Sequence, residues 1–124
     1  MAITVRVQGA NMEITPSIYN YVVKKIEMLD KYVNPEDTSA LCDVEIGKTT
    51  AHHRSGDIFK AEFNLHIAHK YFYTVAEKED LYAAIDEVKD EMAEILTHEK
   101  DKRISLLKRG GRKVKRILRG WYRK

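Results

Sequence analysis

Histidines and one cysteine are the residues of this sequence that could bind a metal ion. His66 and His69 have the H-x-x-H spacing, and Cys42 is the only cysteine of the chain. The two histidines fall on a predicted strand and the turn after it, so they do not share a face as they would on a helix. Cys42 belongs to another strand, whose alternation points it inward. We therefore interpret the histidines as surface residues and expect neither a metal site nor a cofactor.

Charged residues that alternate along two predicted strands could exchange protons with a substrate. Asp43 and Glu45 share one face of their strand, and Lys60 and Glu62 share one face of the next. Pairing between neighbouring strands explains these charges more simply than acid–base catalysis does. The sequence also contains no Gly-rich phosphate loop, no G-x-S-x-G and no H-E-x-x-H motif. We expect a protein without enzymatic activity.

The strongest chemical signal is the C-terminal sequence KRGGRKVKRILRGWYRK. Eleven of the 22 Lys and Arg residues lie between Lys102 and Lys124, and all 19 Asp and Glu residues lie before that segment. The formal net charge of +3 therefore conceals +11 in this segment and −8 in the rest of the chain. Such asymmetry indicates a polyanionic partner, either nucleic acid or an anionic membrane.

Three interpretations of this basic segment remain open. Its apolar residues Val114, Ile117, Leu118 and Trp121 have helical spacing, which allows a short amphipathic helix. The cations would neutralise phosphates while Trp121 or Tyr122 stacks on a base. Alternatively, the helix would lie on a membrane surface with Trp as its anchor. The third interpretation is a solvated, partly disordered tail, which could fold back over the acidic part of the chain.

Size and composition favour one cytoplasmic domain. A chain of 124 residues can form a modest core, and a single cysteine cannot form an internal disulfide. The N-terminal sequence MAITVRVQGA does not resemble a signal peptide. No apolar run approaches the roughly 20 residues that a membrane-spanning helix needs.

Hydrophobic periodicity predicts four strands and two helices. Period-two alternation marks strands at 3–9, 41–48, 58–69 and 71–77. A helix begins after Thr15, whose side chain can cap it, with Pro16 at the first helical position. A second, longer helix begins near Asp80, continues to about residue 108 and is broken at Gly110-Gly111. Residues 47–57 are predicted to be a polar loop, and the short turn at His69-Lys70 predicts an antiparallel hairpin.

Each predicted element presents one apolar face. The inward residues are Ile3, Val5 and Val7; Ile18, Val22, Ile26 and Leu29; Cys42, Val44 and Ile46; Phe59, Ala61, Phe63, Leu65 and Ile67; and Leu81, Ile85, Val88, Met92 and Ile95. The order β-α-β-β-β-α predicts an α+β fold, a four-stranded sheet with two helices on one face. We expect a domain at 1–103 and a basic tail at 104–124, partly helical or disordered.

Tyr71, Phe72 and Tyr73 alternate on the last predicted strand. Core packing together with an exposed edge explains this triplet, and we favour that interpretation. The alternative is a surface on which bases stack, as on RNA-binding sheets.

Two segments resemble the ribosome hibernation-promoting factors, also called ribosome-associated translation inhibitors. NMEITPSIYNYVVKKIEMLDKY resembles their first helix through Asn11, Glu13, Thr15, Leu29, Asp30, Lys31 and Tyr32. EDLYAAIDEV resembles the start of their second helix through Asp80, Leu81, Tyr82, Ala84, Ile85 and Asp86. The resemblance covers about residues 1–103.

The resemblance implies a fold similar to double-stranded-RNA-binding domains and a role on the ribosome. Members of that family bind the small subunit in the channel between head and body, where they block messenger and transfer RNA on idle ribosomes under stress. For this chain it implies a monomeric, cytoplasmic translation inhibitor that binds small-subunit rRNA, or the whole ribosome, without a membrane or a small-molecule substrate.

The family's RNA contacts come largely from basic residues on the two helices. Lys25 and Lys31 match commonly basic positions, whereas Glu91, Glu94 and His98 stand where cations are frequent. We therefore hypothesise that the tail supplies the charge missing from the second helix. The candidate RNA-binding residues are Lys25, Lys31, Lys78, Lys89, Lys102, Arg103, Lys108, Arg109, Arg112, Lys113, Lys115, Arg116, Arg119, Trp121, Arg123 and Lys124.

Two rival functions remain open at this point. A general double-stranded-RNA module would bind any A-form duplex by its shape. A membrane-surface protein would use residues 104–122 as its anchor.

Overall fold

The computed structural model describes residues 1–49 and 56–109, which form a sheet layer and a helix layer. The elements are β1 (Thr4–Ala10), α1 (Pro16–Glu27), the 3-10 helix η1 (Asp30–Tyr32), β2 (Leu41–Thr49), β3 (Ile58–Ile67), β4 (Lys70–Lys78) and α2 (Leu81–Arg109). This order confirms the predicted β-α-β-β-β-α arrangement and the α+β class.

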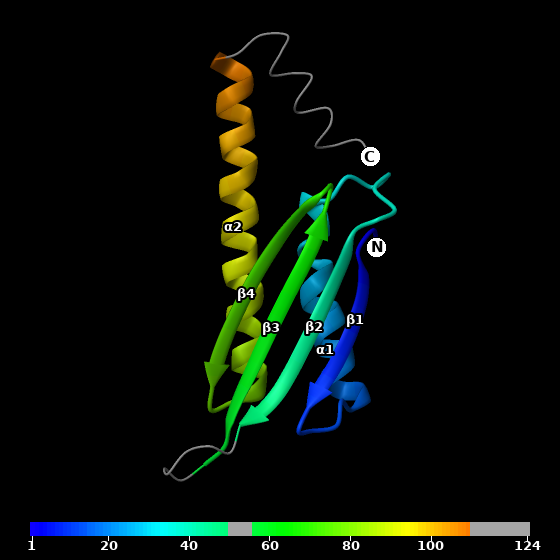
Figure 1. Ribbon diagram of the computed structural model, residues 1–124, viewed down its shortest axis with the longest axis vertical. Coiled ribbons are helices and arrows are strands. Elements are labelled where there is room, and N and C mark those ends of the chain that lie inside the picture. Colours follow the sequence, from blue (N-terminus) through cyan, green and yellow to red (C-terminus); the bar gives the residue numbers. More distant parts are fainter. Residues whose placement is uncertain (50–55, 110–124) are drawn as a thin grey trace.

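The four strands form one sheet in the order β1-β2-β3-β4. β1 runs parallel to β2, whereas β3 pairs antiparallel with both of its neighbours, which confirms the predicted hairpin. Both helices cover the same face of the sheet and leave the other face open (Figure 1). The C-terminal part of α2 projects beyond the end of the strands (Figure 1).

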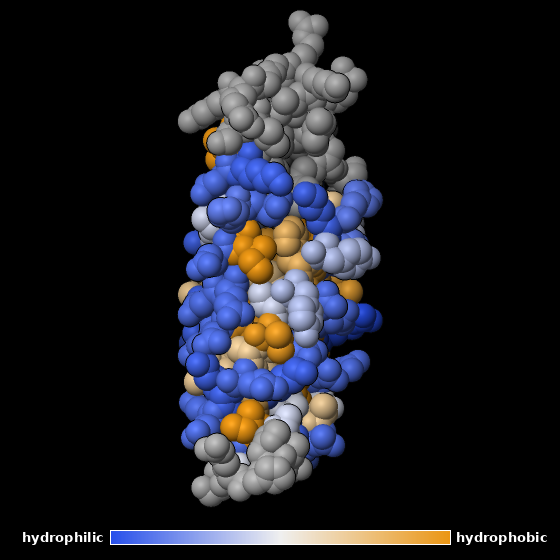
Figure 2. All heavy atoms as spheres, turned by 60° about the vertical axis from the view of Figure 1, so that its left-hand side comes forward, coloured by the Kyte–Doolittle hydropathy of each residue, from blue (hydrophilic) through white to orange (hydrophobic). Residues whose placement is uncertain are grey.

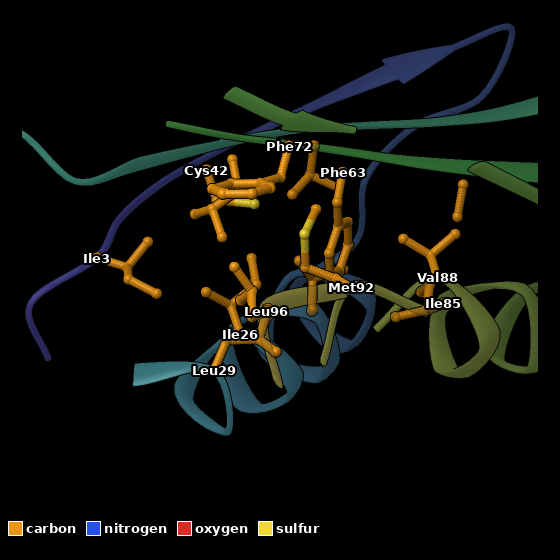
Figure 3. Close-up of a cluster of buried hydrophobic side chains, with 14 of the residues drawn as sticks. Ile3, Ile26, Leu29, Cys42, Phe63, Phe72, Ile85, Val88, Met92 and Leu96 are labelled. Carbon is orange, nitrogen blue, oxygen red and sulfur yellow. The ribbon is translucent and has the colours of Figure 1, made fainter. Parts of the chain in front are cut away.

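The core lies between the inward face of the sheet and the two helices. Side chains from β2, β3 and β4 meet those of α1 and α2 there (Figure 3). Phe63, Ile26 and Met92 are among the largest side chains with no exposed surface. The predicted inward residues of α1, β2 and β3 lie in or against this cluster, as do Ile3, Val5 and Val7 from the first strand and its approach.

One predicted core residue of α2 is wrong. Ile95 is 37% exposed, whereas the next residue, Leu96, is only 3% exposed. Steps of four residues from Val88 through Met92 reach Leu96, because the helical period is 3.6 rather than 3.5 residues. Leu96 lies beside Ile26 and Leu29 of the first helical segment, where it fills the space between the helices (Figure 3).

The start of α1 follows its predicted signals. The Thr15 hydroxyl accepts a hydrogen bond of 3.2 Å from the backbone N–H of Ile18, and Pro16 occupies the first helical position. The cap satisfies one N–H group that has no partner within the helix. Ile18, Val22 and Ile26 then face the core at intervals of four.

β2 continues into the segment that was predicted to be a loop. Gly47, Lys48 and Thr49 pair with Lys60, Phe59 and Ile58 of β3. Gly47 is also paired with Ala10, and a Cβ atom at Gly47 would lie 3.2 Å from the Ala10 Cβ atom. This glycine therefore allows two strands to approach closely, and it does not begin a loop.

The β3–β4 turn consists of Ala68 and His69, one residue earlier than predicted. Both residues have positive φ, 46° and 70°, although neither is glycine. A two-residue hairpin turn with positive φ at both positions has the twist that matches the strands. The turn therefore stores strain, because a side chain in this conformation costs about 1–2 kcal/mol.

The aromatic triplet of β4 has the arrangement that we favoured. Phe72 is buried at 9% exposure, whereas Tyr71 and Tyr73 are 72% and 53% exposed. Core packing thus explains Phe72 but leaves the two tyrosines without a role in the core.

Replacing His69 with glycine should stabilise the fold. Glycine removes the steric cost of positive φ, which exceeds the extra entropy of the unfolded chain, and the net gain should be about 0.5–1 kcal/mol. Urea unfolding measures this change. The matched control is Glu77→Gly, which places glycine in extended strand backbone and should destabilise by about 1 kcal/mol. A loss of stability in His69→Gly would contradict the strain that we assign to the turn.

Candidate nucleic-acid interface

The two helices run in the same direction and touch at two levels. The Tyr21 hydroxyl donates to Asp86 Oδ1 at 2.6 Å, and the hydroxyls of Tyr32 and Thr97 are 2.7 Å apart. Tyr32 follows Tyr21 by the same number of residues as Thr97 follows Asp86. The two helical segments therefore run side by side, and η1 lies beside the middle of α2. This arrangement brings the predicted lysines of the first helical segment next to those of α2.

Asp86 joins the two helices. Its carboxylate accepts from Tyr21 and lies 3.1 Å from the Lys25 ammonium group, which in turn lies 5.2 Å from the centre of the Tyr21 ring. Tyr82 packs edge-on against Tyr21, with 4.8 Å between ring centres. Partial burial by itself would raise the pKa of the Asp86 carboxyl group. The hydrogen bonds that Tyr21 and Lys25 donate to the carboxylate have a larger combined effect, so the pKa lies below its usual value. Lys25 is therefore already paired within the domain.

Two more of the predicted lysines have carboxylate partners. The Lys78 ammonium group is 2.9 Å from Glu87, and that of Lys89 is 2.7 Å from Asp90. The hydrogen bond to Glu87, and then its charge, raise the pKa of Lys78. The exposed Lys78–Glu87 pair contributes at most about 1 kcal/mol to stability, whereas in the second pair the Lys89 side chain is only 13% exposed. Their main effect is to cancel much of the attraction that each lysine would exert on a phosphate.

The first half of α2 is acidic on its solvent side. We name as the acidic face its five carboxylates Asp86, Glu87, Asp90, Glu91 and Glu94, which line a hollow of about 400 Å³ next to Lys78. On the side of the molecule that carries α2 and β4, hydrophilic residues dominate and apolar residues form small separate patches (Figure 2). Asp86, Glu87 and Asp90 are paired with lysines, so Glu91 and Glu94 are the acids of this face without an ion-pair partner among the described residues. The face as a whole keeps a net negative charge, which repels a phosphate backbone and makes it unsuited to RNA.

Cations without carboxylate partners gather where η1 meets α2. We name Lys31, Lys100 and Lys102 the basic end; all three are exposed. No carboxylate lies within ion-pair distance of them in residues 1–49 and 56–109. Tyr32 holds Lys31 beside Thr97 of α2, about one turn before Lys100. Lys31 belongs to η1, whereas Lys100 and Lys102 belong to α2, whose last turns continue beyond the sheet to Arg109 (Figure 1).

The remaining predicted residues divide into two groups. Arg103, Lys108 and Arg109 lie on the last turns of α2. Outside the described residues lie Arg112, Lys113, Lys115, Arg116, Arg119, Trp121, Arg123 and Lys124.

The residues considered for zinc are kept apart by the fold. Burial raises the pKa of the Cys42 thiol to about 12, so it stays protonated in the core. His66 lies on the open face of the sheet, where its ring stacks on Tyr71 at 4.4 Å. Within the described ranges, no three His, Cys, Asp or Glu side chains form a group that could hold a metal ion.

Sequence reasoning missed Asp86 and Lys100 as members of this region. Lys100 lies two residues before Lys102 and could have been found by extending the basic segment past Asp101. Asp86 has no local signal for its role, because its partners Tyr21 and Lys25 lie more than 60 residues away. Only the packing of the two helices reveals it.

Comparison with protein families gives a match over most of the chain. The family described as Sigma 54 modulation protein / S30EA ribosomal protein matches residues 5–104. A protein of Klebsiella oxytoca named ribosome hibernation promoting factor is 31% identical over 96 residues, which are 77% of this chain and 92% of that protein. A protein of Azotobacter vinelandii with the same name is 28% identical over 100 residues, 81% and 85% of the two chains.

Solved structures share the fold. The N-terminal domain of Protein Y from Thermus thermophilus is 28% identical with a TM-score of 0.58, over 79% of this chain and 98% of that domain. A ribosomal subunit interface protein from Coxiella burnetii has a TM-score of 0.63 over the same shares of the two chains. Its identity of 14% makes it evidence of the fold alone. In the described part of this chain, no helix is long and apolar enough to cross a membrane.

Removing the Asp86 carboxylate should loosen the contact between the helices. Asp86→Ala leaves the Tyr21 hydroxyl and Lys25 without their acceptor, so it should lower the free energy of unfolding by about 1 kcal/mol at pH 7. The native pKa of Asp86 is lowered, so this contribution is present above the ordinary carboxyl pKa of 3.8 and is lost as pH falls through the lower native value. Urea unfolding at pH 7 and at pH 3 or below measures both effects.

The matched control for this experiment is Asp90→Ala. Asp90 is exposed and pairs only with its neighbour Lys89, so its removal should change stability by less than about 0.5 kcal/mol. Equal losses in the two variants, or a loss in Asp86→Ala that persists at low pH, would contradict the linking role of Asp86.

Proposed function

Because the chain belongs to the Sigma 54 modulation protein / S30EA ribosomal protein family, as its resemblance to hibernation factors predicted, we propose that it is a ribosome hibernation factor that inhibits translation. It binds rRNA of the small subunit in the channel that messenger and transfer RNA use. Its mechanism is occlusion, so it needs no cofactor and no residue that makes or breaks bonds. It acts in the cytoplasm as a monomer.

The observation that carries this proposal is the separation of charge along α2. The first half of the helix presents the acidic face, whereas the basic end lies where η1 meets α2, and the last turns of α2 after it project beyond the sheet (Figure 1). A basic projection can enter a groove lined with phosphates, and an acidic face keeps the rest of the helix away from them. We infer that rRNA contacts the basic end, and that Lys25, Lys78 and Lys89 contribute less because carboxylates neutralise them.

The two parts of the chain have separate roles in this proposal. The domain at 1–103 selects the site, and the cations of residues 104–124 add affinity that depends little on sequence. Under this proposal, the cations of residues 104–124 supply affinity that related proteins often obtain from cations on the second helix. Two acids, Glu91 and Glu94, are therefore tolerated at those helix positions.

Neutralising the basic end should weaken ribosome binding. In Lys31→Gln/Lys100→Gln/Lys102→Gln, the loss of three phosphate contacts should reduce the slope of log affinity against log salt by about 2–3. Sucrose-gradient co-sedimentation with purified ribosomes across a salt series measures it. The control Arg6→Gln/Lys48→Gln/Lys60→Gln changes the net charge equally, using cations that are paired with carboxylates on the sheet. Equal effects in both variants would contradict the assignment of rRNA to the basic end.

Neutralising the tail should lower affinity without changing the target. A full-length variant with Gln at Arg112, Lys113, Lys115, Arg116, Arg119, Arg123 and Lys124 should lose about 3 from the salt slope if half of these cations touch phosphates. It should still bind near one copy per small subunit at low salt. An unchanged slope would refute the hypothesis that the tail replaces charge missing from α2.

The same assay separates the rival functions. Equal affinity for ribosomes and for an unrelated RNA duplex would indicate a general double-stranded-RNA module. Flotation with anionic liposomes, together with no ribosome association, would indicate a membrane-surface protein.

A further inference from the structure

The open face of the sheet has a shape and composition that the proposed rRNA contact does not use. It lies opposite the helices and, within the described residues, no helix covers it (Figure 1). A hollow of about 280 Å³ spans the strands on this face. Its walls include Arg6, Asp43, Glu45, Glu62, Asn64 and Tyr73.

Tyr73 of β4 lines this hollow, and Tyr71 precedes it by two residues on the same strand. Tyr71 and Tyr73 are 72% and 53% exposed, and Val75 beside them is 37% exposed. The Tyr71 ring is already stacked on His66 with 11° between the ring planes, whereas no such ring stacking is found for Tyr73 among the described residues. Large exposed rings on an edge strand contribute little to the core, so they are available to a partner.

Carboxylates occupy the middle of the same face. Glu45 of β2 lies directly opposite Glu62 of β3 in the strand register. Like charges in this position destabilise a sheet. Glu62 has Lys60 at 3.1 Å, but within the described ranges no cation lies within ion-pair distance of Glu45. The arrangement therefore costs stability and leaves one carboxylate ready for an external cation.

The local electrostatic potential is negative. Asp43 is held by Arg6 through two hydrogen bonds of 2.8 and 3.1 Å, which leaves the Glu45–Glu62 pair as the dominant charge beside Tyr73. Partial burial, and then the charge of Glu62 and a hydrogen bond to it, raise the pKa of Tyr73, and the charge of Glu45 adds to this effect. A nucleic acid whose bases stacked on Tyr73 would bring its phosphates towards these carboxylates, which disfavours the RNA-binding alternative for this sheet.

A guanidinium group satisfies both features of the face. It stacks on a tyrosine ring through its planar surface and donates paired hydrogen bonds to a carboxylate. In an extended peptide, every second side chain points to the same side. The side chains on one face of a sheet strand have the same two-residue spacing. We propose that the open face docks an arginine-rich, extended protein segment, with a guanidinium held between Tyr73 and the Glu45–Glu62 pair. This surface is separate from the basic end, so the proposal stands or falls independently of rRNA binding.

The test uses the full chain and a synthetic (Arg-Ser)₄ peptide. Amide chemical-shift changes in a titration should map to β2, β3 and β4, and (Lys-Ser)₄ should bind more weakly because an ammonium group lacks the planar fork. Glu45→Gln/Glu62→Gln should weaken (Arg-Ser)₄ binding at least tenfold. This variant removes repulsion between like charges, so unfolding would not explain the loss. Tyr73→Leu, which keeps apolar bulk, should weaken binding several-fold.

The matched control is Glu91→Gln/Glu94→Gln on the acidic face. It removes the same charge from the opposite side of the molecule and should leave the affinity within about twofold. Three results would overturn the proposal: no binding to the folded chain at low salt, equal losses in the two double variants, or shifts that map to α2. Tighter binding of a single-stranded RNA to the Tyr71–Tyr73 surface would assign the face to nucleic acid instead.

Discussion

Packing of α2 across the inward face of the sheet is the contact on which the rest of this molecule depends. Ile85, Val88 and Met92 have no exposed surface, and Leu96 is 3% exposed. Full burial of each such side chain contributes roughly 1.5–3 kcal/mol, far more than any exposed ion pair. These residues therefore fix the rotation of the helix about its axis. Once that rotation is set, the directions of all the charged residues on α2 follow.

The same rotation determines how charge is presented. The acidic face belongs to the first half of α2, and two cations of the basic end, Lys100 and Lys102, belong to its second half. The distribution of charge along the helix thus prepares one end of it for a polyanion. Asp86 completes the arrangement by attaching α1 at a defined level, so that η1 brings Lys31 towards the cations of α2.

Local patterns predicted the elements because each depends on neighbours in the chain. Thr15 and Pro16 set the start of α1, and alternation along β3 defined its inward face. Predictions failed where contacts between residues far apart in the sequence determine the structure. Gly47 looks like the start of a loop until Ala10 is seen against it. Leu96 rather than Ile95 is buried because α1 packs at that level, and Lys25 looks available until Asp86 is brought to it. The sequence reveals how many cations there are but not which of them are neutralised.

Charge on the surface limits how the domain can be oriented against a polyanion. The acidic face of α2 and the Glu45–Glu62 pair of the open sheet face lie on opposite layers, and both repel phosphates. The basic end lies further along the helix layer, where η1 meets α2, and the last turns of α2 project past the strands (Figure 1). A groove lined with phosphates would therefore attract the molecule by one end and repel it on two sides. Attraction alone would hold the domain in many orientations, whereas repulsion from both layers leaves the end-on approach as the favourable one. In the proposed complex the acids would confer orientation and the cations affinity, so the 19 carboxylates of the chain are compatible with binding to RNA.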